Sequence, residues 1–218
     1  MENIDLLVAT LAFAGSLGGA SVAFALEALR RRLEERSKRV TACNRVMITL
    51  ATQHDQLDAI YRQSMKPYVD HPVRYVAMPP VLPLGAHAPR LDIESLVFLL
   101  ETDDRKLVRE LMVEQDRYDL ALQAVNQRSK VHHDIAQPRL AAANVKEHSV
   151  IPREELEEVL GPTLVIELRR ATDHAFEHIE GARKSTHDVA KRFSATMRKR
   201  FGKKVVYLGL RELDRSAD

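Results

Sequence analysis

The sequence contains no tryptophan, only 5% aromatic residues and a single cysteine, Cys43, among its 218 residues. One cysteine excludes an internal disulfide and any zinc site built from several thiolates. Cys43 lies on the apolar stripe of its predicted helix, so we expect a buried core residue and not a reactive nucleophile. The scarcity of aromatic residues, together with 29% charged residues and abundant Ala, Leu, Glu and Arg, favours helices over sheets.

Motifs for nucleotide and acyl chemistry are also missing. The sequence has no P-loop, no glycine fingerprint of a dinucleotide-binding fold and no nucleophile elbow. The nine histidines include no repeated Glu-x-x-His pairs of the kind that a di-iron bundle needs. The net charge is only +2, so bulk charge does not argue for nucleic acid binding. The sequence therefore predicts no enzyme, no cofactor and no small-molecule substrate.

One metal-binding pattern remains. His174, Glu177 and His178 form an H-x-x-E-H motif, and histidines four residues apart on a helix can share one zinc ion. Only 40 residues follow His178, and the sequence offers no third ligand or surrounding catalytic domain. We therefore interpret the motif as a solvated helix face, and a zinc-dependent hydrolase is the least favoured alternative.

Charged residues are absent from residues 6–26, LLVATLAFAGSLGGASVAFAL. Twenty-one helical residues span about 32 Å, enough to cross a hydrocarbon core of about 30 Å. Glu2 and Asp5 precede the segment and arginines follow it, so the positive-inside rule places residues 1–5 outside and the rest of the chain in the cytoplasm. The favoured prediction is one transmembrane helix in the inner (plasma) membrane. A signal peptide cleaved at the A-x-A-like residues 23–25 and a soluble buried helix are the alternatives.

Small residues recur on one side of this predicted span. Gly15 and Gly19 form a G-x-x-x-G pair, which lets two helix backbones approach closely in lipid. The sequence leaves open whether a second copy of the chain or another protein packs there. The predicted helix-packing face consists of Ala12, Gly15, Ser16, Gly19, Ala20 and Ala23.

An apolar seam with heptad spacing follows the span. No glycine or proline occurs between Ala20 and Met65, and the seam positions alternate spacings of three and four. We expect residues 27–65 to form a coiled-coil-like stalk helix that continues the transmembrane helix. The seam consists of Leu26, Leu29, Leu33, Arg36, Val40, Cys43, Met47, Leu50, His54, Leu57, Tyr61 and Ser64.

Proline interrupts the helical pattern after the stalk. Six of the nine prolines lie in residues 66–91, which cannot form a regular helix and are predicted to be an irregular connection. Its apolar side chains suggest that this connection packs on the bundle and crosses it lengthwise. Residues 203–218 are predicted to be a C-terminal tail, either a short strand or a docked segment.

Residues 92–202 carry the patterns of further helices. One long helix is expected to end near Ala136, where Pro138 intervenes, and another to extend from about Thr163 to Phe201. Shorter helices precede each of them. Because the long helices have comparable lengths, the predicted fold is all-α, an elongated cytoplasmic bundle of about three long helices that includes the stalk.

Basic residues cluster in two places. Residues 27–45 carry seven Lys/Arg against three Glu, directly after the predicted span. A plain cationic helix end without a specific ligand is the favoured interpretation. The alternatives are an anionic membrane surface and a nucleic acid backbone, which basic residues interleaved with an aromatic can bind. The second cluster surrounds Phe201 and consists of Arg198, Lys199, Arg200, Lys203 and Lys204.

These features predict a single-pass membrane protein that tethers a helical scaffold. Its expected partners are the membrane and either a second copy of the chain or a membrane or cytoplasmic protein. The alternative is a membrane-tethered binder of anionic lipid or nucleic acid through the basic tail, with lipid favoured over nucleic acid.

Overall fold

The computed structural model describes the backbone of residues 2–82, 88–145 and 152–205, and the side chains from residue 22 onward within these ranges. Every regular element in these ranges is helical, which confirms the predicted all-α class. The elements are α1 (Glu2–Ile60), a π-helical turn (Tyr61–Met65), a 3₁₀ turn (Lys66–Tyr68), α2 (Arg74–Ala77), a 3₁₀-helix (Glu94–Leu99), α3 (Arg105–Val131), a second π-helical turn (His132–Ala136), α4 (Gln137–Ala142), α5 (Arg153–Leu160), α6 (Pro162–Phe201) and a last 3₁₀ turn (Gly202–Lys204).

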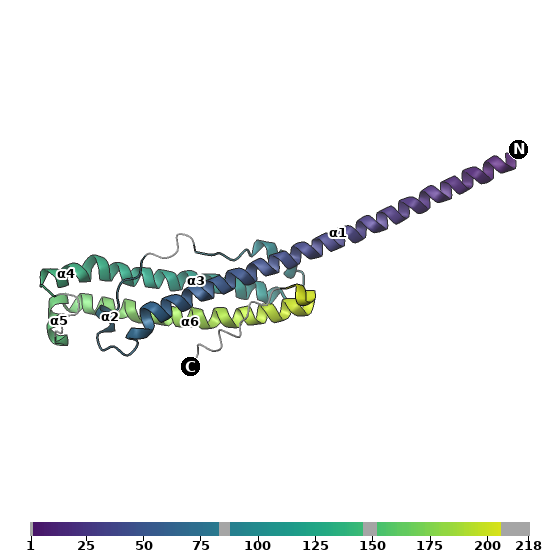
Figure 1. Ribbon diagram of the computed structural model, residues 1–218. Coiled ribbons are helices and arrows are strands. Elements are labelled where there is room, and N and C mark those ends of the chain that lie inside the picture. The colour runs from purple at the N-terminus through teal and green to yellow at the C-terminus, as the bar shows by residue number, and fades with distance from the viewer. Residues whose placement is uncertain (1, 83–87, 146–151, 206–218) are drawn as a thin grey trace.

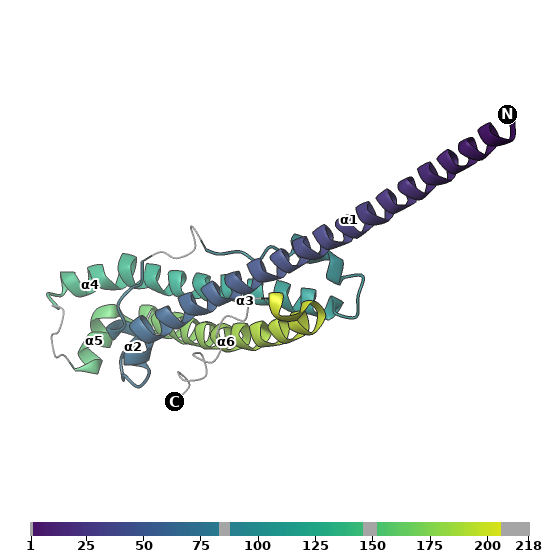
Figure 2. The same cartoon turned by 45° about the vertical axis from the view of Figure 1, so that its right-hand side comes forward.

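Three long helices, α1, α3 and α6, form an elongated bundle, as predicted (Figure 1). The short helices α4 and α5 lie at one end of this bundle, which we call the distal end. α1 leaves the bundle at the opposite, proximal end, and its N-terminal part extends well beyond the other helices in both views (Figure 2). The chain therefore has a packed body and a single projecting helix.

The predicted transmembrane segment, residues 6–26, lies in α1, which runs through it without a break. Where side chains are described, no helix is long and apolar enough to cross a membrane. The side chains of residues 6–21 lie outside that part of the chain. The transmembrane helix accordingly stays a prediction.

The predicted heptad seam divides at Val40. From Val40 to Leu57 its apolar members are buried in the bundle core, because α6 and α3 cover this half of α1. Before Val40 no apolar member of the seam belongs to a core cluster among the described residues. Its three leucines there are more than half exposed: Leu26 (61%), Leu29 (54%) and Leu33 (59%). One helix thus carries a core face and, beyond the bundle, an exposed apolar stripe.

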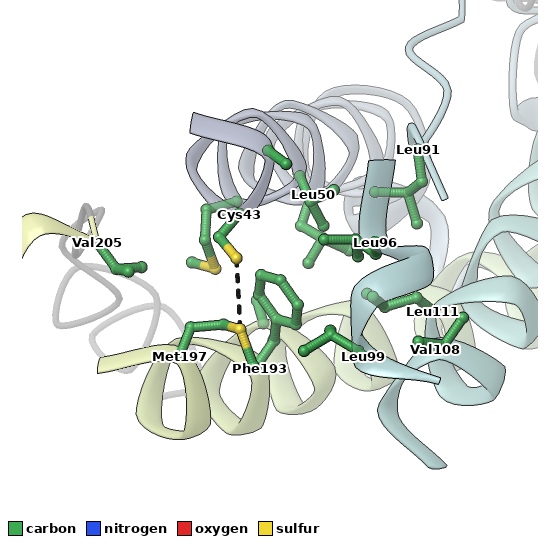
Figure 3. Packing of buried hydrophobic residues seen from close by; sticks show 14 of the residues in the cluster. Cys43, Leu50, Leu91, Leu96, Leu99, Val108, Leu111, Phe193, Met197 and Val205 are labelled. Carbon is green, nitrogen blue, oxygen red and sulfur yellow. Dashed lines mark hydrogen bonds between the residues drawn. The ribbon is translucent and has the colours of Figure 1, made fainter. Parts of the chain in front are cut away.

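The proximal core joins α1, the 3₁₀-helix Glu94–Leu99, α3 and α6. In Figure 3, Cys43 of α1 points toward Met197 of α6, and the thiol donates a weak hydrogen bond of 3.4 Å to the thioether sulfur. Cys43 has no exposed surface, and burial raises its pKa to about 11. The predicted burial of Cys43 is confirmed.

The proline-rich connection runs along the bundle from the distal toward the proximal end. The backbone N–H of Val81 donates a 3.0 Å hydrogen bond to Ser129 Oγ in the C-terminal part of α3. Ten residues later, the N–H of Leu91 donates a 2.9 Å bond to Gln115 Oε1, nearer the beginning of α3. Side chains of α3 therefore take the place of a neighbouring strand or helical turn as hydrogen-bond partners for this segment.

The helical path continues beyond Ala136, so the predicted end of the second long helix is wrong. The π-helical turn His132–Ala136 is followed directly by α4, with Pro138 in its first turn. Proline lacks the N–H that a helix interior needs, and a widened turn relieves the clash between its ring and the preceding carbonyl. The chain absorbs this proline as a local bulge instead of ending the helix.

Candidate functional site

The two basic stretches of the sequence meet at the proximal end of the bundle. Asn44 Nδ2 on α1 donates a 3.2 Å hydrogen bond to the carbonyl of Lys204, which holds the last 3₁₀ turn beside α1. A groove opens between α1 and the C-terminal end of α6. Its lining, which we call the basic groove, consists of Arg32, Glu35, Arg36, Arg39, Arg200 and Phe201.

Helix geometry aligns three of these arginines. Arg32, Arg36 and Arg39 are spaced by four and then three residues, so their side chains lie on one face of α1. Like charges at this spacing destabilise a helix by about 0.2–0.5 kcal/mol per pair. Within the ranges described above, no carboxylate lies within ion-pairing distance of Arg32 or Arg36. Positive charge is therefore concentrated on this face without an intramolecular counterion for two of its members.

Two neighbouring arginines on α1 are neutralised. Arg30 Nε lies 2.8 Å from Glu34 Oε1, and Arg31 Nε lies 2.9 Å from Glu27 Oε1. These pairs are four residues apart, the spacing at which opposite charges support a helix. The same short stretch thus contains paired arginines outside the basic groove and unpaired arginines within it.

The other two arginines of the basic groove have partners. Arg39 lies 3.9 Å from the carboxylate of Glu35, and its guanidinium carbon is 5.4 Å from the centre of the Phe98 ring. Arg200 Nη1 lies 2.7 Å from Asp104 Oδ2, a short ion pair that ties the end of α6 to the turn before α3. These contacts orient Arg39 and Arg200 while leaving much of their surface open, and a charged pair at such exposure contributes little to stability.

Phe201 is not part of an exposed basic-aromatic surface, which corrects the prediction for the C-terminal cluster. It is 7% exposed and packs edge-on against Phe98, with the ring centres 6.1 Å apart. Phe201 extends the apolar stripe of α6 by one turn beyond Met197, so the core takes it. Lys199, Lys203 and Lys204 are exposed, and Arg198 is half-buried. The predicted tail beyond Val205 lies outside the described residues.

The H-x-x-E-H motif lies on the surface of α6. His174 and Glu177 are exposed and His178 is half-buried, and the two imidazole rings are 6.0 Å apart and nearly perpendicular. No group of three or more His, Cys, Asp or Glu side chains arranged to hold a metal ion is found in the described portion of the chain. Among these residues, the structure brings no third ligand to the motif.

Most of the predicted helix-packing face lies outside the described side chains. Ala12, Gly15, Ser16, Gly19 and Ala20 have side chains outside the described residues. Ala23, the last member, is exposed on the projecting part of α1, three residues before Leu26 of the exposed stripe.

A buried arginine that the sequence analysis missed organises the interior. Arg128 of α3 has no exposed surface, and its guanidinium donates to the backbone carbonyls of Tyr75, Met78 and Pro79. Burial lowers its pKa to about 10, so it stays charged at neutral pH. Two features of the sequence could have predicted this role. Arg128 lies on the apolar stripe of α3, three positions after Val125, and the proline-rich segment needs hydrogen-bond donors from elsewhere in the chain.

A second groove, at the distal end, contains arginines that are already paired. Arg74 lies 2.8 Å from Asp173, and Arg153 and Arg169 lie 2.6 Å and 2.5 Å from Glu157. Hydrogen bonds from Arg153 and from Tyr75 lower the pKa of Glu157. Each of these three arginines thus has a carboxylate partner, in contrast to Arg32 and Arg36 of the basic groove.

Comparisons of the chain with models of known protein families, with curated proteins and with solved structures gave no match. The geometry of the chain itself is therefore the basis for a functional assignment, and the candidate site is the basic groove together with the exposed stripe of α1.

Proposed function

We propose that this protein is a single-pass membrane protein whose cytoplasmic helical bundle serves as a non-catalytic scaffold, assembling with a second copy or with a partner protein. One observation carries the proposal: α1 is a single helix that contains the uncharged residues 6–26 and also a side of the bundle core. A span that continues into a packed helix would hold the bundle at a fixed height above the membrane.

The charges around the segment support an orientation in the inner (plasma) membrane. Glu2 and Asp5 precede it, whereas Arg30, Arg31 and Arg32 follow it closely. Positive residues near a span are retained on the cytoplasmic side. The bundle is accordingly proposed to be cytoplasmic, with the N-terminus outside.

The exposed stripe of α1 supports assembly. Leu26, Leu29 and Leu33 continue the seam that is buried further along the same helix, and each is more than half exposed. Exposed apolar residues in a continuous row mark surfaces that pack against another protein or the membrane. The small-residue face predicted in the span would extend the same contact into the lipid.

Extraction with alkaline carbonate tests the anchor. Full-length protein expressed in bacteria should stay with the membrane pellet, because an inserted helix resists carbonate whereas peripheral proteins are released. Recovery of intact protein in the soluble fraction would rule out the anchor.

Cysteine crosslinking tests assembly through the stripe. Cys43 is buried and should not react, so Leu33→Cys adds a single accessible thiol to the membrane-embedded protein. Oxidation should convert Leu33→Cys into disulfide-linked dimers if two copies pack through the stripe. Arg31→Cys, on another face of the same turn, is the matched control. Equal crosslinking of the two variants, or none in either, would contradict self-assembly through this face.

A second candidate function is favoured by the convergence of Arg32, Arg36, Arg39 and Arg200 in one groove. Lipid headgroups and nucleic acids both present phosphates that arginine binds well. Anionic lipid is the better candidate, because Phe201 is packed in the core and is not available to stack on a base.

A further inference from the structure

We infer that the basic groove is a docking surface for the anionic headgroups of the membrane that holds the chain. This inference rests on the membrane anchor proposed above and adds a second contact to it. The anchor uses residues 6–26, whereas the docking surface is built from two segments far apart in the sequence, α1 and the end of α6.

The charge pattern of the basic groove calls for an external anion. Arg32 and Arg36 have no carboxylate partner among the residues described, and both line the same groove as Arg39 and Arg200. Glu35 is the one acid in the lining, and at 3.9 Å it makes only a loose pair with Arg39. Guanidinium groups bind phosphate oxygens through paired hydrogen bonds, so a phosphate would relieve the repulsion along this face.

The position of the groove along α1 matches the membrane surface. With 1.5 Å per residue, Arg32 lies about 9 Å beyond the end of the predicted span at Leu26, and Arg36 lies about 15 Å beyond it. The headgroup layer is about 5–7 Å thick, and charges act over a Debye length of about 8 Å beyond it. Arg32 and Arg36 are thus within reach of lipid phosphates. A helix tilt of about 20° toward the groove, common for spans, would bring Arg39 and Arg200 closer.

Other arginines of the protein are paired with carboxylates and are therefore less suited to bind lipid phosphates. Arg30 and Arg31 are at the same height as Arg32 but are paired with Glu34 and Glu27. The distal groove is rich in arginine as well, yet it lies at the far end of the bundle, and each of its three arginines is paired with Asp173 or Glu157. Among the side chains described, Arg32 and Arg36 thus combine three properties: they lack a carboxylate partner, they line a groove, and they lie next to the predicted span.

Site-specific fluorescence quenching in vesicles tests the docking. A fluorophore on Ala195→Cys reports on the proximal end of α6, since residue 195 is exposed and Cys43 is buried. The labelled full-length protein is reconstituted into phosphatidylcholine vesicles with or without phosphatidylglycerol, and both contain a lipid with a nitroxide on its headgroup. Quenching should be stronger with phosphatidylglycerol and should fall at high salt, because ions screen the attraction.

Two double variants distinguish an effect of the basic groove from an effect of net charge alone. Arg32→Gln with Arg36→Gln should lower the equilibrium between docked and undocked bundle about 30-fold, because each arginine near an anionic surface contributes about fivefold. Arg30→Gln with Arg31→Gln removes the same formal charge and should keep the quenching close to that of the unmodified chain. Equal quenching in vesicles without phosphatidylglycerol, or an equal loss in both double variants, would overturn the docking surface.

Soluble competitors identify the source of the phosphate. Inositol hexakisphosphate and a short single-stranded RNA are added at low concentration to the phosphatidylglycerol vesicles. Quenching that persists supports lipid docking, whereas its loss to either competitor would assign the groove to a soluble phosphate compound or to nucleic acid and overturn lipid docking. Vesicle flotation tests the anchor separately. If the protein floats but its quenching does not depend on the lipid, only the docking is overturned. If the protein does not float, both proposals are overturned.

Discussion

The guanidinium of Arg128 on α3 donates a 2.8 Å hydrogen bond to the carbonyl oxygen of Pro79 in the proline-rich connection. Its second terminal nitrogen donates to the carbonyls of Met78 and Tyr75. One buried side chain therefore satisfies three backbone acceptors at the point where the short helix α2 ends and the chain becomes extended.

Replacing Arg128 with methionine should lower the free energy of unfolding by about 2–4 kcal/mol, because the carbonyls of the buried residues Tyr75 and Met78 would lose their donor at a cost of about 1–3 kcal/mol each, and the apolar side chain recovers part of that loss. Urea unfolding of the full-length protein in detergent, followed by circular dichroism, measures the change. Arg170→Met removes an exposed arginine from α6 and should shift the midpoint little. A loss of similar size in both variants would mean that the hydrogen bonds of Arg128 do not stabilise the proline-rich connection.

His132 should make the protein less stable as the pH falls. Burial and the nearby charge of Arg128 lower its pKa to about 4, against an ordinary value of 6.5, and Nε2 lies 2.9 Å from the carbonyl of Val76. Protonation therefore favours the unfolded chain, so the stabilisation is complete above pH 6.5 and is lost as the pH falls from 6.5 toward 4. The loss due to this group is about 3 kcal/mol.

Urea unfolding at pH 7 and at pH 4.5 measures this effect. His132→Gln preserves a donor to Val76 but cannot titrate, so its stability should fall less between the two pH values than that of the unmodified chain. An unaltered slope in His132→Gln would assign the acid sensitivity to other groups, such as His54, whose pKa burial also lowers.

Cys43 should react with iodoacetamide only when the bundle opens. Its pKa of about 11 lowers the thiolate fraction at pH 8 about 100-fold relative to an ordinary thiol of pKa 9.0, and the side chain has no exposed surface. Mass spectrometry after alkylation should find the folded protein unmodified and the urea-unfolded protein fully modified. Ser37→Cys, an exposed position on the same helix, should react at once in the folded state. Rapid modification of Cys43 without denaturant would contradict the packing in Figure 3.

Glu114 and Thr186 should be energetically coupled across the α3–α6 interface. Thr186 Oγ1 donates a 2.6 Å hydrogen bond to Glu114 Oε1, and both side chains are fully buried. Thr186→Val should cost about 1–3 kcal/mol, the usual range when a buried polar group loses a hydrogen-bond partner. A double-mutant cycle with Glu114→Gln should give a coupling energy of about 1 kcal/mol or more, because the two residues are in direct contact. Strictly additive losses would show that the bond contributes no net stability.

The helical segments were predictable because their signals are local. The boundaries expected for the last helix, from about Thr163 to Phe201, differ by one residue from α6, since Gly161-Pro162 opens it and Gly202, with a φ of 75°, ends it. The seam from Val40 to Leu57 is buried as its spacing predicted. The end of the preceding segment was not predictable from Pro138 alone, because a π-helical turn can absorb a proline.

The candidate site was predictable only in its parts. The basic residues around Phe201 and those after residue 26 were evident as two clusters, yet nothing in the sequence linked them across the chain. Phe201 was misassigned because an aromatic among basic residues looks the same whether it faces solvent or extends a core stripe. Arg128 was missed because its partners are backbone carbonyls about 50 residues earlier, which leave no trace in side-chain pattern.

The sequence by itself determined the helical class, the register of the buried faces and the irregularity of the proline-rich connection, because periodicity, caps and prolines act within a few residues. Only the tertiary structure decided which basic residues share a groove, which of them find a carboxylate, and where the seam of α1 leaves the core. Those outcomes depend on how far α3 and α6 extend along α1, and that distance is set by packing between segments far apart in the chain.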